Sequence, residues 1–157
     1  MTTPDPDAAP RPRDVFRRST SLDALNAQSR GTAMEPLGIV FSEIGPDFLR
    51  ATMPVDARTH QPYGLLHGGA SALLAETLGS TAGMLAADDG RGVVGIELNA
   101  NHVRGVRSGQ VTGTVRPLHV GRSTQVWDIR IEDEAGRLVC VSRLTLAVID
   151  LPAGGAR

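Results

Sequence analysis

Glu76 is the only formally charged residue in a segment of small and apolar residues that runs from Gly64 to Ala86. The composition of this segment predicts a helix from about Gly68 to Ala87 that is buried on nearly every side. A carboxylate buried without a partner is energetically costly, so Glu76 must be paired, protonated or used in a reaction. Its chemistry would be that of a general base or a nucleophile.

The start of this helix is a second candidate for chemistry. Gly68 and Gly69 follow His67 directly, at the point where backbone N–H groups lack intrahelical acceptors and the helix dipole is positive. Residues without side chains let a ligand reach these N–H groups, so the turn could stabilise an oxyanion. A capping role for His67 is the structural alternative.

The spacing of these two features limits how they can act together. Gly68 and Glu76 are eight residues apart, which is about 12 Å along a helix that rises 1.5 Å per residue. A base and an oxyanion donor at that separation cannot act on the same carbonyl. If both are catalytic, the site combines the helix start of one subunit with the carboxylate of another; otherwise Glu76 is paired across a dimer interface without a catalytic role.

Helical periodicity divides the predicted helix into two faces. The face around Glu76 is predicted to hold only small residues, namely Ala72, Gly79, Ser80 and Gly83. The opposite face is predicted to pack on a sheet and carries Ala70, Leu73, Leu74, Thr77, Leu78, Thr81 and Leu85. A ligand or a second copy of the chain could approach the first face closely.

Short elements surround the long helix. Thr20 to Gln28 is predicted to be a short helix with Thr20 or Ser21 as its N-cap. Strands are predicted at residues 39–44, 48–55, 93–106, 110–120, 123–132 and 138–149. Turns are predicted at Gly45-Pro46-Asp47, Arg107-Ser108-Gly109 and Asp133-Glu134-Ala135-Gly136. In the strand at 123–132, Gln125, Trp127, Ile129 and Ile131 share one face.

This order predicts an α+β fold in which a curved antiparallel sheet of about six strands wraps around one long central helix. Residues 21–150 are predicted to form a single domain, with flexible tails at 1–20 and 151–157. One helix covers only part of such a sheet, and long strands leave exposed edges in a monomer. We therefore expect the chain to form a homo-oligomer.

Composition excludes several classes of function. The chain has 157 residues, which fits one domain, and its 16 basic and 17 acidic residues give a net charge of -1, so no global field attracts nucleic acid or an anionic membrane. An aromatic content of 3% argues against a stacking platform for single-stranded nucleic acid. A lone cysteine, Cys140, and the lack of a signal-peptide or membrane-span pattern predict a cytoplasmic protein.

An ordered set of residues resembles the hotdog-fold acyl-CoA thioesterases, in the 4-hydroxybenzoyl-CoA thioesterase branch with a glutamate on the central helix. This set consists of Gln61, His67-Gly68-Gly69, Glu76, Ser80 and Asn101-His102-Val103-Arg104. Within the branch, the chain is similar to small bacterial hydrolases of 1,4-dihydroxy-2-naphthoyl-CoA and of mischarged aryl carriers. The likeness covers about residues 33–149.

The resemblance implies hydrolysis of an aromatic or medium-chain acyl-CoA to the free acid and CoA. It implies that Glu76 is the nucleophile or the general base and that the Gly68 N–H stabilises the oxyanion. Gln61 and His67 would orient or polarise the thioester carbonyl, and Ser80 would position the water or the carboxylate.

The resemblance also implies a set of substrate- and CoA-binding residues, namely Thr81, His102, Arg104, His119, Arg122 and Ser123. No metal and no cofactor are implied, because CoA is part of the substrate. The implied assembly is a homotetramer, a dimer of dimers, with its active sites at subunit interfaces.

Other chemistries fit the sequence less well. The four histidines show no spacing typical of a metal site, and the segment around Ser71 lacks the final glycine of a nucleophile elbow. No hydratase motif with a catalytic histidine is present. The remaining alternative is a non-catalytic module of the same fold that binds acyl-CoA or an aromatic ligand, which would bind without turnover.

Overall fold

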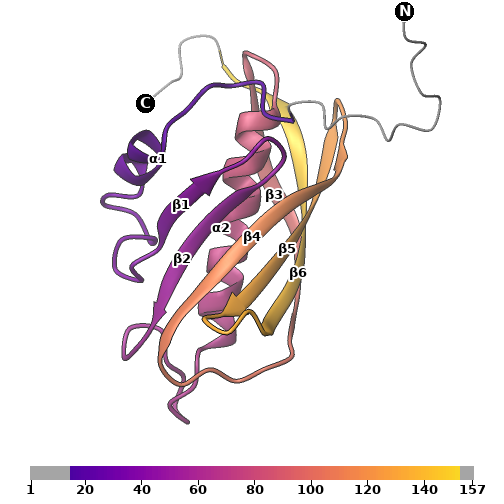
Figure 1. Cartoon of the computed structure of the whole chain (residues 1–157). Coiled ribbons are helices and arrows are strands. Elements are labelled where there is room, and N and C mark those ends of the chain that lie inside the picture. The colour runs from indigo at the N-terminus through magenta and orange to yellow at the C-terminus, as the bar shows by residue number, and fades with distance from the viewer. Residues whose placement is uncertain (1–14, 153–157) are drawn as a thin grey trace, which may run out of the picture.

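The computed structural model describes residues 15–152 and shows six strands and two helices. The strands are β1 (Val40–Ile44), β2 (Leu49–Val55), β3 (Arg91–His102), β4 (Gly109–Val120), β5 (Thr124–Asp133) and β6 (Leu138–Asp150). The helices are α1 (Leu22–Gln28), which Ser21 caps as predicted, and α2 (Gly68–Ala86). Figure 1 shows the antiparallel sheet curving around α2, so the predicted fold class is confirmed.

The order of the strands differs from the order that the predicted turns imply. The sheet runs β1-β2-β4-β5-β6-β3, so β3 pairs with β6 and lies at an edge. The predicted turn Arg107-Ser108-Gly109 does not join neighbouring strands; residues 103–108 cross from this edge back to β4. Three strand spacings amount to about 14 Å, which six extended residues can span. A polar turn signal marks a chain reversal and does not specify which strands pair.

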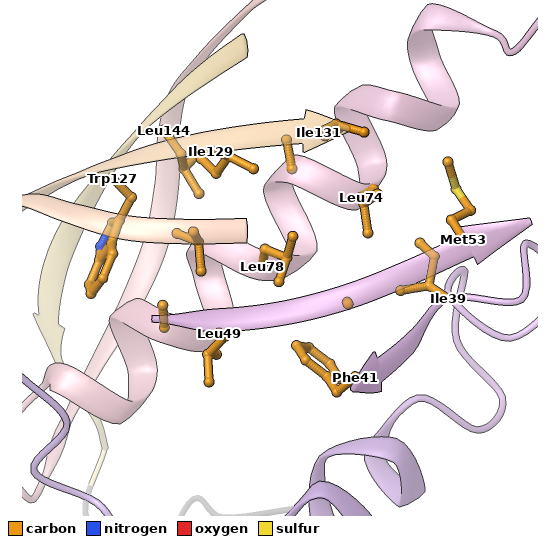
Figure 2. Packing of buried hydrophobic residues seen from close by; sticks show 14 of the residues in the cluster. Ile39, Phe41, Leu49, Met53, Leu74, Leu78, Trp127, Ile129, Ile131 and Leu144 are labelled. Atoms are coloured by element: carbon orange, nitrogen blue, oxygen red, sulfur yellow. The ribbon is translucent and has the colours of Figure 1, made fainter. Parts of the chain in front are cut away.

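The core lies between α2 and the concave face of the sheet (Figure 2). The side chains of Trp127, Ile129 and Ile131 are fully buried, as the alternation in β5 predicted. Gln125 is buried as well, and its amide is satisfied because its Nε2 donates to Gly83 O while its Oε1 accepts from Trp127 Nε1.

The faces of α2 are only partly as predicted. Gly79 and Gly83 lie against the sheet, where an added Cβ would overlap Leu144 and Leu146. Leu73, Thr77 and Thr81, predicted to pack on the sheet, instead line the open side together with Glu76. The buried arc of α2 is centred nearer Ala75 and Leu78, so Glu76 lies at the border of the buried arc rather than in the middle of the open face. Close packing of β6, which the sequence cannot show, requires the two glycines.

Part of the predicted N-terminal tail has a defined place. The backbone N–H groups of Arg17 and Arg18 both donate to Leu85 O near the end of α2, at 2.8 and 3.0 Å. The rest of that tail, residues 1–14, and residues 153–157 of the predicted C-terminal tail lie outside the described residues. Within residues 15–152, no helix has the length and hydropathy needed to span a membrane.

The packing of Gly83 leads to a stability prediction. Gly83→Ala should lower the free energy of unfolding by about 1–3 kcal/mol, because the methyl group overpacks Leu146 and Gln125. Urea unfolding measures this difference, with Thr77→Ala on the open side of α2 as control. If Gly83→Ala instead stabilised the protein by about 1 kcal/mol, as helix propensity alone requires, close packing of Gly83 against Leu146 and Gln125 would be contradicted.

Candidate active site

Glu76 projects from the middle of α2 into an open cavity of about 290 Å³. The walls are Thr32, Ala33, Met34, Leu73, Thr77, Ser80 and Thr81. The carboxylate is half-buried, and Ser80 Oγ, one helical turn further on, donates to Glu76 Oε1 at 3.5 Å. The structure thus places Ser80 beside Glu76, and Thr81 on the same side of the helix.

The environment of Glu76 favours its neutral form. Burial raises the pKa of this carboxyl above its ordinary value, and the hydrogen bond from Ser80 opposes the rise only in part. Within residues 15–152, no arginine or histidine forms an ion pair with Glu76. A carboxylate that is desolvated, unpaired and open to a cavity has the properties of a reactive base.

The start of α2 presents a separate group of polar atoms. His67 is the N-cap, and its Nδ1 accepts from Gly69 N–H at 2.8 Å. Because Nδ1 is the acceptor, a neutral ring carries its proton on Nε2, where it can be donated. The Gly68 N–H has no acceptor within the described residues. His67 is therefore both a cap and a potential donor, and the two roles do not compete.

His102 closes the other side of this helix start. A Cβ on Gly68 would lie 2.8 Å from His102 Nε2, so the imidazole at the end of β3 packs directly against the glycine. Arg104, two residues further on, is exposed, and its Nε donates to Leu138 O at 3.3 Å. Both residues lie at the N-terminal end of α2 rather than beside Glu76.

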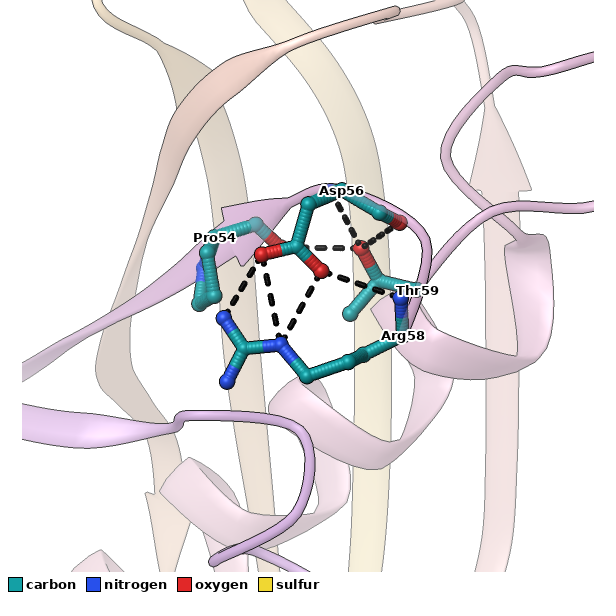
Figure 3. Close-up of polar contacts among 4 residues, drawn as sticks. All are labelled: Pro54, Asp56, Arg58 and Thr59. Atoms are coloured by element: carbon teal, nitrogen blue, oxygen red, sulfur yellow. Dashed lines mark hydrogen bonds and ion pairs between the residues drawn. The ribbon is translucent and has the colours of Figure 1, made fainter.

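The loop before α2 holds Gln61 and is anchored by a polar turn at its start (Figure 3). Asp56 accepts from the backbone N–H and the guanidinium of Arg58, and Thr59 Oγ1 donates to Pro54 O at 2.9 Å. The side-chain hydrogen bond from Arg58 lowers the pKa of Asp56 to about 2. Further along the loop, Gln61 Oε1 accepts from Tyr63 N–H. The Gln61 amide NH₂ thereby remains available as a donor.

A third group lies at the far end of α2. Arg122 and Ser123 are in the turn between β4 and β5, whereas His119 lies in β4 just before it and pairs with Val126. Arg122 borders a second cavity, of about 260 Å³, together with Arg17, Arg91 and Ala87. Apart from Thr81, which lies on the same side of α2 as Glu76, the candidate CoA-binding residues are therefore divided between opposite ends of a helix about 27 Å long, and one protomer does not bring them together.

Two features near Glu76 were not predicted from the sequence. The connection between α1 and β1 supplies Thr32, Ala33 and Met34 to the cavity wall, and no sequence pattern in that connection indicates contact with α2. Gly95 in β3 lies against the Glu76 carboxylate, where a Cβ would overlap Oε1. The sequence signal for this contact is weak, because a glycine in a strand is typical of a bulge or a close approach, but the same strand holds a second glycine, Gly92.

Comparisons with known proteins agree with the fold and the motif. The sequence profile of the thioesterase superfamily matches residues 63–140. The proofreading thioesterase EntH of Cronobacter sakazakii is 58% identical over 86% of this chain and 98% of its own length. The 1,4-dihydroxy-2-naphthoyl-CoA hydrolase of Escherichia coli is 55% identical over 86% of this chain and 99% of its own length.

The solved structures show the same relationship in three dimensions. A thioesterase of Haemophilus influenzae superposes with a TM-score of 0.86 at 49% sequence identity, covering 90% of this chain and 99% of its own. Identity at this level, over nearly the whole of each relative, confirms the resemblance seen in the motifs. The chain belongs to the thioesterase superfamily, with the hotdog fold.

Proposed function

We propose that this chain hydrolyses an aromatic or medium-chain acyl-CoA thioester to the free acid and CoA. The observation that carries the proposal is the Glu76 carboxylate, which is unpaired within the described residues, has a raised pKa and borders a cavity. The names of the two relatives support thioester chemistry, and the name of the Escherichia coli relative favours an aromatic acyl group. The alternative of a binding module predicts stoichiometric binding without turnover.

In the proposed reaction, the thioester carbonyl oxygen lies at the start of α2. The Gly68 N–H stabilises the negative charge that develops on this oxygen, and the His67 Nε2–H and the Gln61 amide help to orient the carbonyl. Such donors act best when they are fixed before reaction. The His67–Gly69 and Gln61–Tyr63 hydrogen bonds supply that fixation.

Glu76 acts from the opposite side of the carbonyl by one of two routes. As a general base, it takes a proton from water while the water oxygen bonds to the carbonyl carbon. As a nucleophile, it forms an acyl anhydride that water then hydrolyses. In the first route the carbon–sulfur bond then breaks and the proton held by Glu76 passes to the CoA sulfur. In the second route the CoA thiolate leaves as the anhydride forms, and it is protonated by the proton that hydrolysis of the anhydride releases. Ser80 holds the carboxylate oxygen in place.

The assembly is part of the proposal, because Gly68 and Glu76 of one protomer are about 12 Å apart on α2. The edge strand β3 carries Val94, Ile96 and, just beyond its end, Val103, which are 44%, 62% and 57% exposed. Pairing of this edge with a second copy would cover these side chains and complete the sheet. We further propose that two such dimers form a tetramer with active sites at subunit interfaces.

The acyl group can be identified with a panel of thioesters. Aryl-CoA, medium-chain acyl-CoA and aryl carrier thioesters are offered to the purified protein, and the released thiol is measured. We expect turnover, with the highest kcat/KM for an aromatic acyl group. Binding of every thioester without release of thiol would contradict the proposed function and support the binding module.

Glu76→Gln should abolish turnover while stabilising the fold. The loss of the carboxylate should lower kcat by about 10²–10⁴-fold. In the wild type, the raised pKa of Glu76 means that its ionised form destabilises the folded state. Below about pH 4 the carboxyl is protonated and the folded state has its full stability; this stability is lost as the pH rises through the pKa of Glu76 in the folded state. Thermal melts should therefore show a higher Tm for Glu76→Gln at pH 7 and no difference below about pH 4. An active variant, or a lower Tm at pH 7, would contradict this role.

Gly68→Pro should remove the oxyanion donor without breaking α2. Because any Cβ at this position also meets His102 Nε2, Gly68→Ala, which keeps the N–H, is the matched control. Gly68 is the first helical residue and His67 before it has φ -70 and ψ 132, a conformation that accepts a following proline. Loss of this N–H should lower kcat by about 10²–10³-fold, with an unchanged circular dichroism spectrum. Wild-type kcat in this variant would exclude the Gly68 N–H from the mechanism.

Light scattering coupled to size-exclusion chromatography tests the assembly. We expect an even-numbered oligomer of the 16.5 kDa chain at every concentration that shows activity. A fully active monomer would be incompatible with a site that needs two protomers.

A further inference from the structure

The side chain of Glu76 touches β3 at a residue that has no side chain. A Cβ on Gly95 would overlap Glu76 Oε1 and lie 3.3 Å from Glu76 Cδ. Gly95 is not among the glycines with positive φ, so its backbone conformation does not itself require glycine. The feature that excludes a larger residue at this position is the carboxylate.

β3 is irregular at the same place. Gly95 pairs with Leu146 of β6 and Glu97 pairs with Thr145, so Ile96 is an extra residue in the register. Such a bulge bends a strand locally and is frequent beside active sites. The bulge and the missing side chain thus coincide at the point where Glu76 meets the sheet.

We propose that Gly95 is a positioning residue for the reaction: its bare backbone at the β3 bulge forms the surface against which the Glu76 carboxylate is held. The inference rests on the proposed catalytic role of Glu76. Gly95 would act through Glu76, by keeping the carboxylate withdrawn from water and pointed along one direction while Ser80 fixes the same oxygen from α2.

A side chain at position 95 would displace the Glu76 carboxylate rather than the backbone of the surrounding elements. The atoms that a Cβ would meet are Oε1, Cδ and Oε2, all at the end of a flexible side chain. Glu76 can therefore rotate away toward the open cavity while β3, β6 and α2 stay in place. The carboxylate would become better solvated and would lose its orientation.

Few other titratable groups of the same protomer lie near the Glu76 carboxylate. None of the other residues that line its cavity is titratable. Glu97, two residues along β3, accepts hydrogen bonds from Asn99 and Thr145 and is exposed. Wild type and Gly95→Ala share His67 and every other titratable group of the proposed interface site, so a difference between their acid limbs would report on the surroundings of Glu76.

The test compares two alanine substitutions in the same strand. Gly95→Ala places a methyl group against Glu76, whereas the control Gly92→Ala places one 2.6 Å from Leu151 Cδ2, another flexible side chain. Both are made in the wild type, and Gly95→Ala is also made in a Glu76→Asp background, whose shorter side chain removes the overlap. Steady-state kinetics across pH and thermal melts are recorded for each variant.

Gly95→Ala should lower kcat by about 10²-fold, the scale expected for a displacement of about 1 Å at a reacting group. The acid limb of kcat/KM should move to lower pH, because a better-solvated carboxyl has a lower pKa. Gly92→Ala should keep wild-type kinetics, and both variants should keep a Tm close to that of the wild type. In the Glu76→Asp background, Gly95→Ala should cost less than about 10-fold.

Several results would overturn the inference. These are wild-type kcat and acid limb in Gly95→Ala, unfolding of that variant, an equal loss in Gly92→Ala, or an undiminished effect in the Glu76→Asp background. A Glu76→Gln variant with wild-type turnover would instead overturn the proposed function, and the inference with it. The two failures are therefore distinguishable.

Discussion

The rigid rise of α2 is the constraint on which the proposed active site depends. The helix carries the proposed oxyanion donor at Gly68 and the carboxylate at Glu76, and it holds them about 12 Å apart. Neither can be moved toward the other without breaking the helix. The helix is in turn fixed by close packing on β6, where Gly79 and Gly83 leave room for Leu144 and Leu146. The core packing therefore sets the geometry of the site.

The same packing explains why a half-buried carboxylate persists. Glu76 lies at the border of the buried arc of α2, where one side meets β3 at Gly95 and the other faces an open cavity. This position raises the pKa of the carboxyl without the full cost of burying an ion. A carboxylate in the buried arc would be neutral, and one in the middle of the open face would be fully solvated and weakly directed.

Much of this arrangement could be predicted from the sequence. The bounds of α2, the capped short helix and the alternation in β5 all follow local patterns that packing reinforces, and the structure confirms them. The order of strands could not be predicted, because the turn signal at Arg107-Ser108-Gly109 carries no information about which edge β3 joins. The prediction of which face of α2 meets the sheet was also partly wrong, because a glycine can allow close packing as readily as it leaves open space.

In the candidate site, too, some features could be predicted from the sequence and others could not. The residue types at Gln61, His67, Gly68 and Glu76 are visible in the sequence because their chemistry is distinctive. The tautomer of His67 depends on a hydrogen bond that only the folded loop shows. The contact between Glu76 and Gly95 depends on a bulge in an edge strand, and a bulge is a property of strand register rather than of local sequence.

Subunit complementation tests most directly whether the site is shared between two protomers. Gly68→Pro and Glu76→Gln chains, each inactive alone, are mixed in equal amounts, unfolded and refolded together. In a two-fold dimer, half of the dimers are mixed and each mixed dimer has one intact site, so a shared site should restore about a quarter of wild-type activity. No recovery of activity, in mixed oligomers shown by mass to have formed, would contradict it.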